Sequence, residues 1–517
     1  MNPAVLEAAR KVFPSAAGSI TLGAVVHEGE CAPEPVVCVP MAMMNRHGLI
    51  AGATGTGKTK SLQLIAEQLS ANGVPVFMAD LKGDLSGVGV PGVSNDKVAQ
   101  RARDTGYAWH GSGFPVEFLS LTGAKGAQLR ATVSSFGPLL LSKVLGLNET
   151  QTSVLSMVFK FCDDQKLLLL DLSDLKAVLQ YLTEDGADEL KAYGGMSNAT
   201  VGVLLREMIE LEQQGADKFF GEPMFDLDDL LQVERDGRGV VSVLELNDVQ
   251  QRPALFSTFM LWMLASLYNE LPEVGDIDKP KLVFFFDEAH LLFDSASSAL
   301  LQQIEQIVRL IRSKGVGVFF ITQSPKDIPE TVLAQLGQRV QHALRAFTPD
   351  DEAALKAAAR TFPKTEFYNV QQTLTSLGIG EALVTILTAQ GTPTPPFVTR
   401  MIPPQSRMGP LLDTEWALRL GTPQVRKYAQ AVDNESAREM LAARHSDSPA
   451  DAGEGAPAPR GQAPAPAPGG DSLLSRIFGS SIGKSMLRTA AVAITGTLVR
   501  DALGVLRGKP RTTRRRR

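Results

Sequence analysis

The sequence predicts an α/β protein with a mostly parallel, doubly wound sheet. Short apolar runs rich in β-branched and aromatic residues recur along the chain, at 74–79, 239–246, 281–286 and 316–321. Stretches with a helical spacing of apolar residues separate these runs. A glycine-rich loop also stands between one apolar run and one helical pattern. Alternating strands and helices of this kind build parallel sheets that carry helices on both faces.

A chain of 517 residues is longer than one hydrophobic core usually supports, so we expect several units. We place them, in chain order, as a small N-terminal strand module (1–45), the first part of the core (46–123), a mostly helical insertion (124–236), the second part of the core (237–410), a helical C-terminal extension (411–445), a linker (446–470) and a tail (471–517). The linker is rich in Pro, Ala and Gly and buries too little apolar surface to fold, so we expect it to be disordered.

The charge of the chain changes sign near its end. The whole chain has a net charge of −5, which argues against a uniformly basic nucleic-acid-binding surface but leaves room for a local basic channel. The tail from Asp471 onward holds eleven basic and two acidic residues and has helical periodicity at 473–506. It fits a contact with DNA phosphates, a helix lying on an anionic membrane, and, at least as well as either of these, a solvated or partner-binding segment.

The segments that would carry the protein across a membrane are missing from the sequence. No apolar run approaches the ~20 residues that span a bilayer, and the first residues do not resemble a signal peptide. Three cysteines cannot form a disulfide framework for a chain of this length. We therefore expect a cytoplasmic protein, with peripheral attachment to a membrane as an option that depends on the tail.

The glycine-rich loop has the complete pattern of a phosphate-binding P-loop. Its residues are Gly52, Ala53, Thr54, Gly55, Thr56, Gly57, Lys58 and Thr59, followed by Lys60 in the expected helix. The glycines let backbone N–H groups turn toward phosphate, and the helix N-terminus favours negative charge. Lys58 is expected to contact the β- and γ-phosphates and Thr59 to bind Mg²⁺. The sequence thus predicts that ATP and Mg²⁺ are bound here.

An acidic pair ends the apolar run at 282–286. A strand of this kind delivers carboxylates to the carboxyl edge of the sheet, where sites in α/β proteins form. Asp287 is expected to hold Mg²⁺ through water, and Glu288 to act as the general base for the attacking water. A second carboxylate directly after the first is typical of NTPases that hydrolyse through many cycles.

Other polar residues are candidates for supporting roles. Gln323 follows the run at 316–321 and is expected to sense the γ-phosphate or orient the water. Asp80 and Asp84 follow another predicted strand, where they fit a role near Mg²⁺ or a neighbouring subunit and a simple turn equally well. An arginine acting between subunits is expected to come from a set that the sequence alone cannot separate. The set comprises Arg309, Arg312, Arg339 and Arg345.

Several stretches together resemble the bacterial YjgR family of HerA-like helicase proteins, a branch of the HerA–FtsK group of RecA-like ATPases. They are 44–50 with the P-loop, 77–84, 219–224, 281–292 and 309–318. The resemblance implies a RecA-like P-loop fold and a ring, commonly of six subunits, that pumps DNA or polypeptide with ATP. It also implies that Lys58, Thr59, Asp287, Glu288 and Gln323 have the roles given above. Only about 45 residues precede the P-loop, so the β-barrel found at this position in HerA is not expected.

Two functions of different classes follow from these observations. The first is an ATP-hydrolysing ring that moves or unwinds DNA. The second is an ATP-dependent assembly or regulatory factor that acts on protein or envelope targets without unwinding DNA. A nucleotide kinase is disfavoured, because the second acidic residue has no use in such an enzyme.

Overall fold

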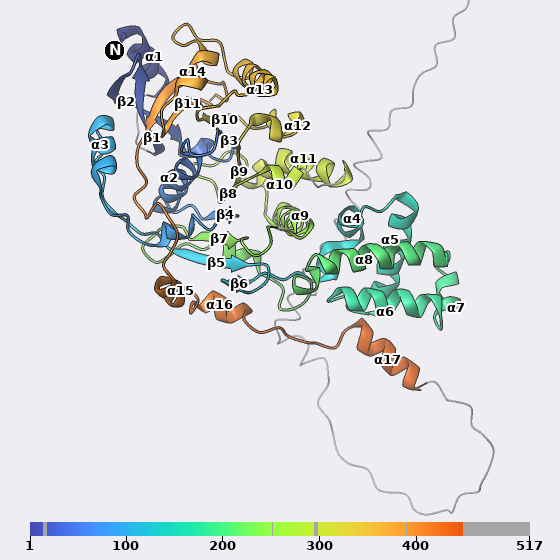
Figure 1. The fold of residues 1–517 in the computed structure, drawn as a ribbon. Coiled ribbons are helices and arrows are strands. Elements are labelled where there is room, and N and C mark those ends of the chain that lie inside the picture. The colour runs from blue at the N-terminus through green and yellow to red at the C-terminus, as the bar shows by residue number, and fades with distance from the viewer. Residues whose placement is uncertain (14–17, 251, 294–297, 389, 448–517) are drawn as a thin grey trace, which may run out of the picture. The chain divides into compact units, whose positions relative to one another are not determined.

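The computed structural model describes residues 1–13, 18–250, 252–293, 298–388 and 390–447 (Figure 1). The chain divides into two compact units, Met1–Ala442 and Ala443–Arg517. The second unit lies almost wholly outside the described residues, and so do the predicted tail and all of the predicted linker beyond residue 447. The features described below belong to the first unit.

A single sheet of twelve strands, in the order β2-β1-β12-β11-β10-β3-β9-β8-β4-β7-β5-β6, organises this unit. The strands are β1 (Ser19–His27), β2 (Glu30–Pro40), β3 (Gly48–Ala51), β4 (Val76–Asp80), β5 (Val116–Ser120), β6 (Ala127–Gln128), β7 (Val241–Glu245), β8 (Leu282–Phe286), β9 (Val316–Thr322), β10 (Gln338–Gln341), β11 (Glu381–Thr385) and β12 (Phe397–Met401).

The sheet has a parallel part and an antiparallel part. Strands β10, β3, β9, β8, β4, β7, β5 and β6 all run in parallel, and β3 lies between β10 and β9. Strands β11, β12, β1 and β2 continue the sheet in antiparallel pairs beyond β10. The predicted fold class, α/β with a mostly parallel doubly wound sheet, is confirmed.

The helices of the described residues, the last of which runs past the end of the first unit, are α1 (Pro3–Val12), α2 (Lys58–Ala71), α3 (Asp96–Thr105), α4 (Val133–Val144), α5 (Glu149–Gln165), α6 (Leu172–Thr183), α7 (Ala187–Lys191), α8 (Asn198–Gln213), α9 (Pro253–Glu270), α10 (His290–Phe293), α11 (Ser298–Ile311), α12 (Glu330–Leu333), α13 (Pro349–Arg360), α14 (Val370–Ser376), α15 (Asp413–Arg419), α16 (Pro423–Tyr428) and α17 (Ala437–Asp447). In Figure 1, α2 and α3 lie on one side of the sheet and α9 on the other. Among the helices of the described residues, none is long and apolar enough to cross a bilayer.

The central strands are apolar on both faces because helices cover both. In β8, Phe284 and Phe286 belong to the core that faces α9 and α11, whereas Val283 and Phe285 belong to the core that faces α2. All four side chains are fully buried. A strand buried on both sides appears in the sequence as a continuous apolar run, which is the pattern that predicted this sheet.

The N-terminal strands do not stand apart from the core. β1 pairs with β12, with Gly23 opposite Met401, so residues expected to form a separate strand module extend the central sheet instead. Strand patterns do not identify the partner of a strand, and this long-range pairing therefore has no local signal. Between β6 and β7 the chain forms five α-helices in succession, α4 to α8.

Candidate functional site

The P-loop connects β3 to the N-terminus of α2. Lys58, the first residue of α2, folds back over the loop and donates from Nζ to the backbone oxygen of Gly52 at 2.6 Å. Its side chain is buried, and burial lowers the pKa of the Lys58 ammonium while the charges of Glu288 and Asp287 oppose that shift. The lysine therefore lies within the field of the acidic pair that follows β8.

The glycines of the loop satisfy different physical requirements. Gly52, Gly55 and Gly57 all have positive φ angles, of 153°, 77° and 117°, which L-amino acids with a side chain rarely adopt. A Cβ on Gly52 would lie 2.5 Å from Cβ of His342, and one on Gly57 would lie 3.3 Å from Gly380. A Cβ on Gly55 would meet no atom within 4 Å, because this glycine faces open space. The loop is thus packed from behind and open in the middle.

Asp287 stands at the end of β8, beside the loop. It is 4% exposed, its Oδ1 accepts from the Glu288 backbone N–H at 3.0 Å, and its buried Oδ2 has no hydrogen-bond partner. Burial, together with the negative charge of Glu288, raises the pKa of Asp287 to about 7. A buried carboxylate oxygen without a partner is costly unless it meets a cation or a donor.

Glu288 has an unusual backbone conformation and one strong partner. Its φ angle is 50°, in the left-handed region, and such outliers are found disproportionately at functional sites. Oε1 accepts from Nζ of Lys82, and Oε2 has no hydrogen-bond partner, with Nδ1 of His290 at 3.4 Å. Burial alone would raise the pKa of Glu288, but the hydrogen bond and charge of Lys82 outweigh it and hold the pKa below its ordinary value.

Gln323 and the two aspartates after β4 differ in their surroundings. Gln323 directly follows β9, next to β3 in the sheet, and its side chain is exposed. Asp80 is buried and accepts backbone N–H groups from Lys82, Gly83 and Leu85. Asp80 therefore stabilises the turn that carries Lys82, which is the simpler of its two expected roles. Asp84 has a buried Oδ1 without a partner.

Three of the candidate arginines lie at the opposite edge of the sheet. Arg309, Arg312 and Arg339 line a cavity of about 550 Å³ together with Arg46, which was not singled out from the sequence. These residues lie at or before the amino ends of β3, β9 and β10, whereas the P-loop lies at the carboxyl ends. Arg46 and Arg312 approach the exposed Asp276 at 3.6 and 3.7 Å. Within one chain these arginines cannot act on a nucleotide in the P-loop. Arg345 follows β10 at the carboxyl edge and is exposed.

The back of the P-loop is supported by residues that the motifs did not reveal. His342 follows β10, and its Nε2 lies 2.9 Å from Oγ of Ser61 in α2, while its Nδ1 lies 2.8 Å from the backbone oxygen of Glu381. Burial lowers the pKa of His342 to about 4, so the ring is neutral near pH 7. The Gly380 N–H donates to the Thr56 carbonyl at 2.9 Å. Of these supporting residues, only Gly380 is of a type that indicates a close backbone contact from the sequence.

A magnesium ion fits the donor set. In the described part of the chain no group of three or more His, Cys, Asp or Glu side chains could hold a metal. These residues therefore do not form a metal site built from protein side chains alone. Mg²⁺ is commonly bound by one or two protein oxygens together with water and substrate phosphates. The partnerless oxygen of Asp287 and the Thr59 hydroxyl in the first turn of α2 are the oxygens that would hold the ion in this way.

The chain is similar in sequence to known helicase-type proteins. The family model for the helicase HerA-like C-terminal region matches residues 27–512. A protein of Methanocaldococcus jannaschii named probable helicase MJECL08 is 27% identical over 154 residues, which is 28% of this chain and 28% of that relative.

Two solved structures are similar to this chain over most of its length. The plasmid coupling protein TrwB with ADP and Mg²⁺ is 15% identical and has a TM-score of 0.48, with 77% of this chain and 100% of that one covered. VirB4 of Thermoanaerobacter pseudethanolicus is 15% identical and has a TM-score of 0.44, with 75% and 97% covered. The family match spans most of the sequence and agrees with the resemblance noted from its motifs. The chain therefore belongs to the helicase HerA-like C-terminal family of P-loop ATPases.

Proposed function

We propose that this protein hydrolyses ATP with Mg²⁺ and uses the reaction to move DNA through a ring of identical subunits. The observation that carries the proposal is that the P-loop of β3 and the Asp287–Glu288 pair of β8 lie at the same carboxyl edge of the sheet, with Lys58 within the field of both carboxylates. A cationic P-loop lysine and two consecutive carboxylates, one metal-binding and one basic, are the parts that ATP hydrolysis requires.

Each of these residues has a distinct role in the proposed reaction. Backbone N–H groups of residues 53 to 59, with Lys60 beyond them, surround the phosphates, and Lys58 contacts the β- and γ-phosphates. Thr59 and Asp287 hold Mg²⁺, which neutralises charge on the phosphates when it is bound. Glu288 accepts a proton from the attacking water through Oε2, the oxygen that Lys82 leaves unoccupied. Gln323 orients that water or senses the γ-phosphate.

Self-association is supported by the position of the arginines. Arg309 and Arg312 lie at the edge of the sheet that is opposite to the P-loop, together with Arg46 and Arg339. Arginines so far from the site of their own chain are suited to reach the nucleotide of a neighbour, where they would stabilise charge in the transition state. A closed ring, for which we propose six subunits, gives every P-loop such a neighbour.

The direct test of the nucleotide chemistry is the Lys58→Ala variant. We expect it to lose tight ATP binding or turnover, measured by calorimetry and by phosphate release. Unchanged hydrolysis would refute the assignment of the P-loop. Mass measurement in solution, with and without a non-hydrolysable ATP analogue, tests the ring, and a mass equal to one chain under both conditions would argue against it.

The test of the substrate is the rate of ATP hydrolysis with and without DNA. If the protein moves along DNA, the rate should rise several-fold, and the increase should fall steeply with salt because phosphate contacts release counterions. A rate that is indifferent to DNA would instead favour the assembly or regulatory factor acting on protein or envelope targets. Truncation before the linker, at residue 446, shows whether the basic tail provides the DNA contact.

A further inference from the structure

The loop between α14 and β11, residues 377–380, lies directly against the P-loop. The Gly380 N–H donates to the Thr56 carbonyl at 2.9 Å, and a Cβ on Gly57 would lie 3.3 Å from Gly380. Gly380 itself has a φ of 72°, which lets its N–H turn toward Thr56. These contacts place the 377–380 loop on one flank of the phosphate-binding backbone.

The order of the strands indicates which end of a nucleotide this flank would meet. β3 carries the P-loop, and the acidic pair lies on the β9–β8 side of it. The γ-phosphate must point toward that side, because Glu288 has to reach the attacking water. The nucleoside is then directed to the other side of β3, where β10 and β11 lie. The 377–380 loop immediately precedes β11.

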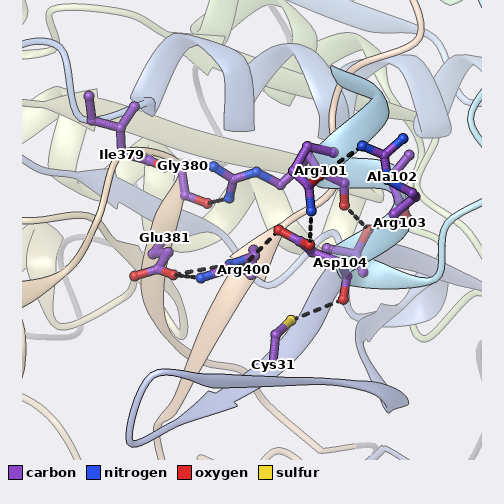
Figure 2. Close-up of polar contacts among 11 residues, drawn as sticks. Cys31, Arg101, Ala102, Arg103, Asp104, Ile379, Gly380, Glu381 and Arg400 are labelled. Atoms are coloured by element: carbon purple, nitrogen blue, oxygen red, sulfur yellow. Dashed lines mark hydrogen bonds and ion pairs between the residues drawn. The ribbon is translucent and has the colours of Figure 1, made fainter. Parts of the chain in front are cut away.

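Ile379 presents an apolar side chain at this position. It is 71% exposed, in contrast to the neighbouring Leu377, which is 6% exposed. Its carbonyl is held from behind by Nη2 of Arg101 at 2.8 Å, and the Gly380 carbonyl by Nη1 at 3.0 Å. Figure 2 shows that the Ile379 side chain points away from the Arg101 and Arg400 guanidinium groups.

An ion-pair network fixes the helix that supplies Arg101. Arg400 in β12 binds Oδ2 of Asp104 in α3 at 3.0 Å and Oε1 of Glu381 at 2.9 Å, so it joins that helix to the start of β11 (Figure 2). A loop held on both sides loses little conformational freedom when a ligand packs on it. Ile379 is thus an exposed apolar residue on a supported loop.

We propose that Ile379 is the surface on which the base of the bound nucleotide packs, and that Arg101 is a positioning residue that holds it there. This inference rests on the proposed function. The isoleucine side chain has no hydrogen-bonding group. The contact therefore strengthens the binding of any nucleotide that has a base, relative to a polyphosphate that lacks one, and does not separate adenine from guanine. Selectivity for a purine would have to come from other groups.

The experiment compares ligands that have a base with one that lacks it. Wild type and Ile379→Ser, both as the full chain with Mg²⁺, are titrated with ATP, GTP and inorganic tripolyphosphate by calorimetry. Loss of one apolar contact should raise the Kd of ATP and of GTP by about tenfold. The Kd of tripolyphosphate should be unchanged. Arg101→Met should raise the Kd of ATP and of GTP and leave that of tripolyphosphate unchanged, as Ile379→Ser does, and Ile379→Leu should have the wild-type values.

Matched variants separate this inference from its alternatives. Leu418 is 81% exposed on α15, away from the P-loop, so Leu418→Ser should change none of the three constants. Equal weakening of ATP and tripolyphosphate in Ile379→Ser would mean that the P-loop itself is disturbed and would overturn the proposal. So would a selective loss in Phe347→Ser, at the exposed residue beyond β10, with none in Ile379→Ser. A wild type that binds tripolyphosphate and ATP equally well would also overturn it, whereas binding of neither would refute the proposed function itself.

Discussion

The pairing of Lys82 with Glu288 predicts that removing the lysine shifts the pH dependence of ATP hydrolysis. Lys82→Met deletes the ammonium that bonds Oε1 of Glu288 and holds the pKa of that carboxyl below its ordinary value. In the variant only the charges of His290 and Lys58 still oppose burial, so the pKa of Glu288 rises. Because Glu288 must be ionised to accept a proton, the acidic limb of the rate profile should move to higher pH.

The size of the shift follows from the exposure of the pair. Two unit charges 4 Å apart interact by about 1 kcal/mol in water and by about 4 kcal/mol near a protein surface. The Glu288 side chain is 5% exposed but that of Lys82 is 47% exposed, so solvent screening places the interaction in the lower part of this range. About 1.4 kcal/mol corresponds to roughly one pKa unit, and we expect a shift of that size.

The assay is the steady-state rate at saturating ATP and Mg²⁺ between pH 4 and 9, a range that includes the lowered pKa of Glu288 in the wild type. The charge of Lys82 also lowers the pKa of Asp287, so in Lys82→Met the titration of Asp287 moves to higher pH together with that of Glu288. Lys82→Arg keeps a cation at this position and should have the wild-type profile. An acidic limb in Lys82→Met that coincides with that of wild type would show either that Lys82 does not control Glu288 or that Glu288 is not the base.

Three further predictions concern single positions in the site. Glu288→Gln should bind ATP but hydrolyse it at least ~10²-fold more slowly, as loss of a general base usually does; normal turnover in single-turnover assays would place the base elsewhere. Because the pKa of Asp287 is raised to about 7 and Mg²⁺ requires the ionised form, Mg²⁺ affinity in the presence of ADP should fall about tenfold from pH 8 to pH 6. Asp287→Asn should bind weakly at both pH values, and a pH-independent affinity in wild type would contradict the assignment. Gly52→Ala should lower the stability measured without nucleotide by about 1–3 kcal/mol more than Gly55→Ala, since only the former brings a Cβ to 2.5 Å from His342; equal losses would mean that backbone strain alone decides.

The fold class and the motifs were predictable because their signals are local. A strand buried on both faces must be a continuous apolar run, and a phosphate-binding loop must have glycines at fixed positions. The partners of those motifs have no such signal. Lys82 and Glu288 are 206 positions apart, and Ser61 and His342 are 281 apart, so one sequence offers no pattern that joins them.

Some expectations failed to separate alternatives for the same reason. Asp80 fitted a metal site and a turn equally well from the sequence, and only its three backbone donors show that it stabilises the turn. The sequence offered the arginines as one set, but three of them lie at the amino edge of the sheet and Arg345 lies at the carboxyl edge, a division that depends on strand order. Arg46 was not included because a single arginine before a strand is ordinary.

The pairing of β1 with β12 also constrains how the protein is made. Gly23 emerges from the ribosome early, and its partner Met401 is synthesised only after nearly the whole first unit has been translated. Until then the hairpin of β1 and β2 exposes the backbone edge that β12 later covers, and uncovered edges of this kind invite pairing with other chains. The segment that contains β12 therefore also protects the nascent chain, and fragments that end before residue 397 should aggregate even when they contain every ATP-binding motif.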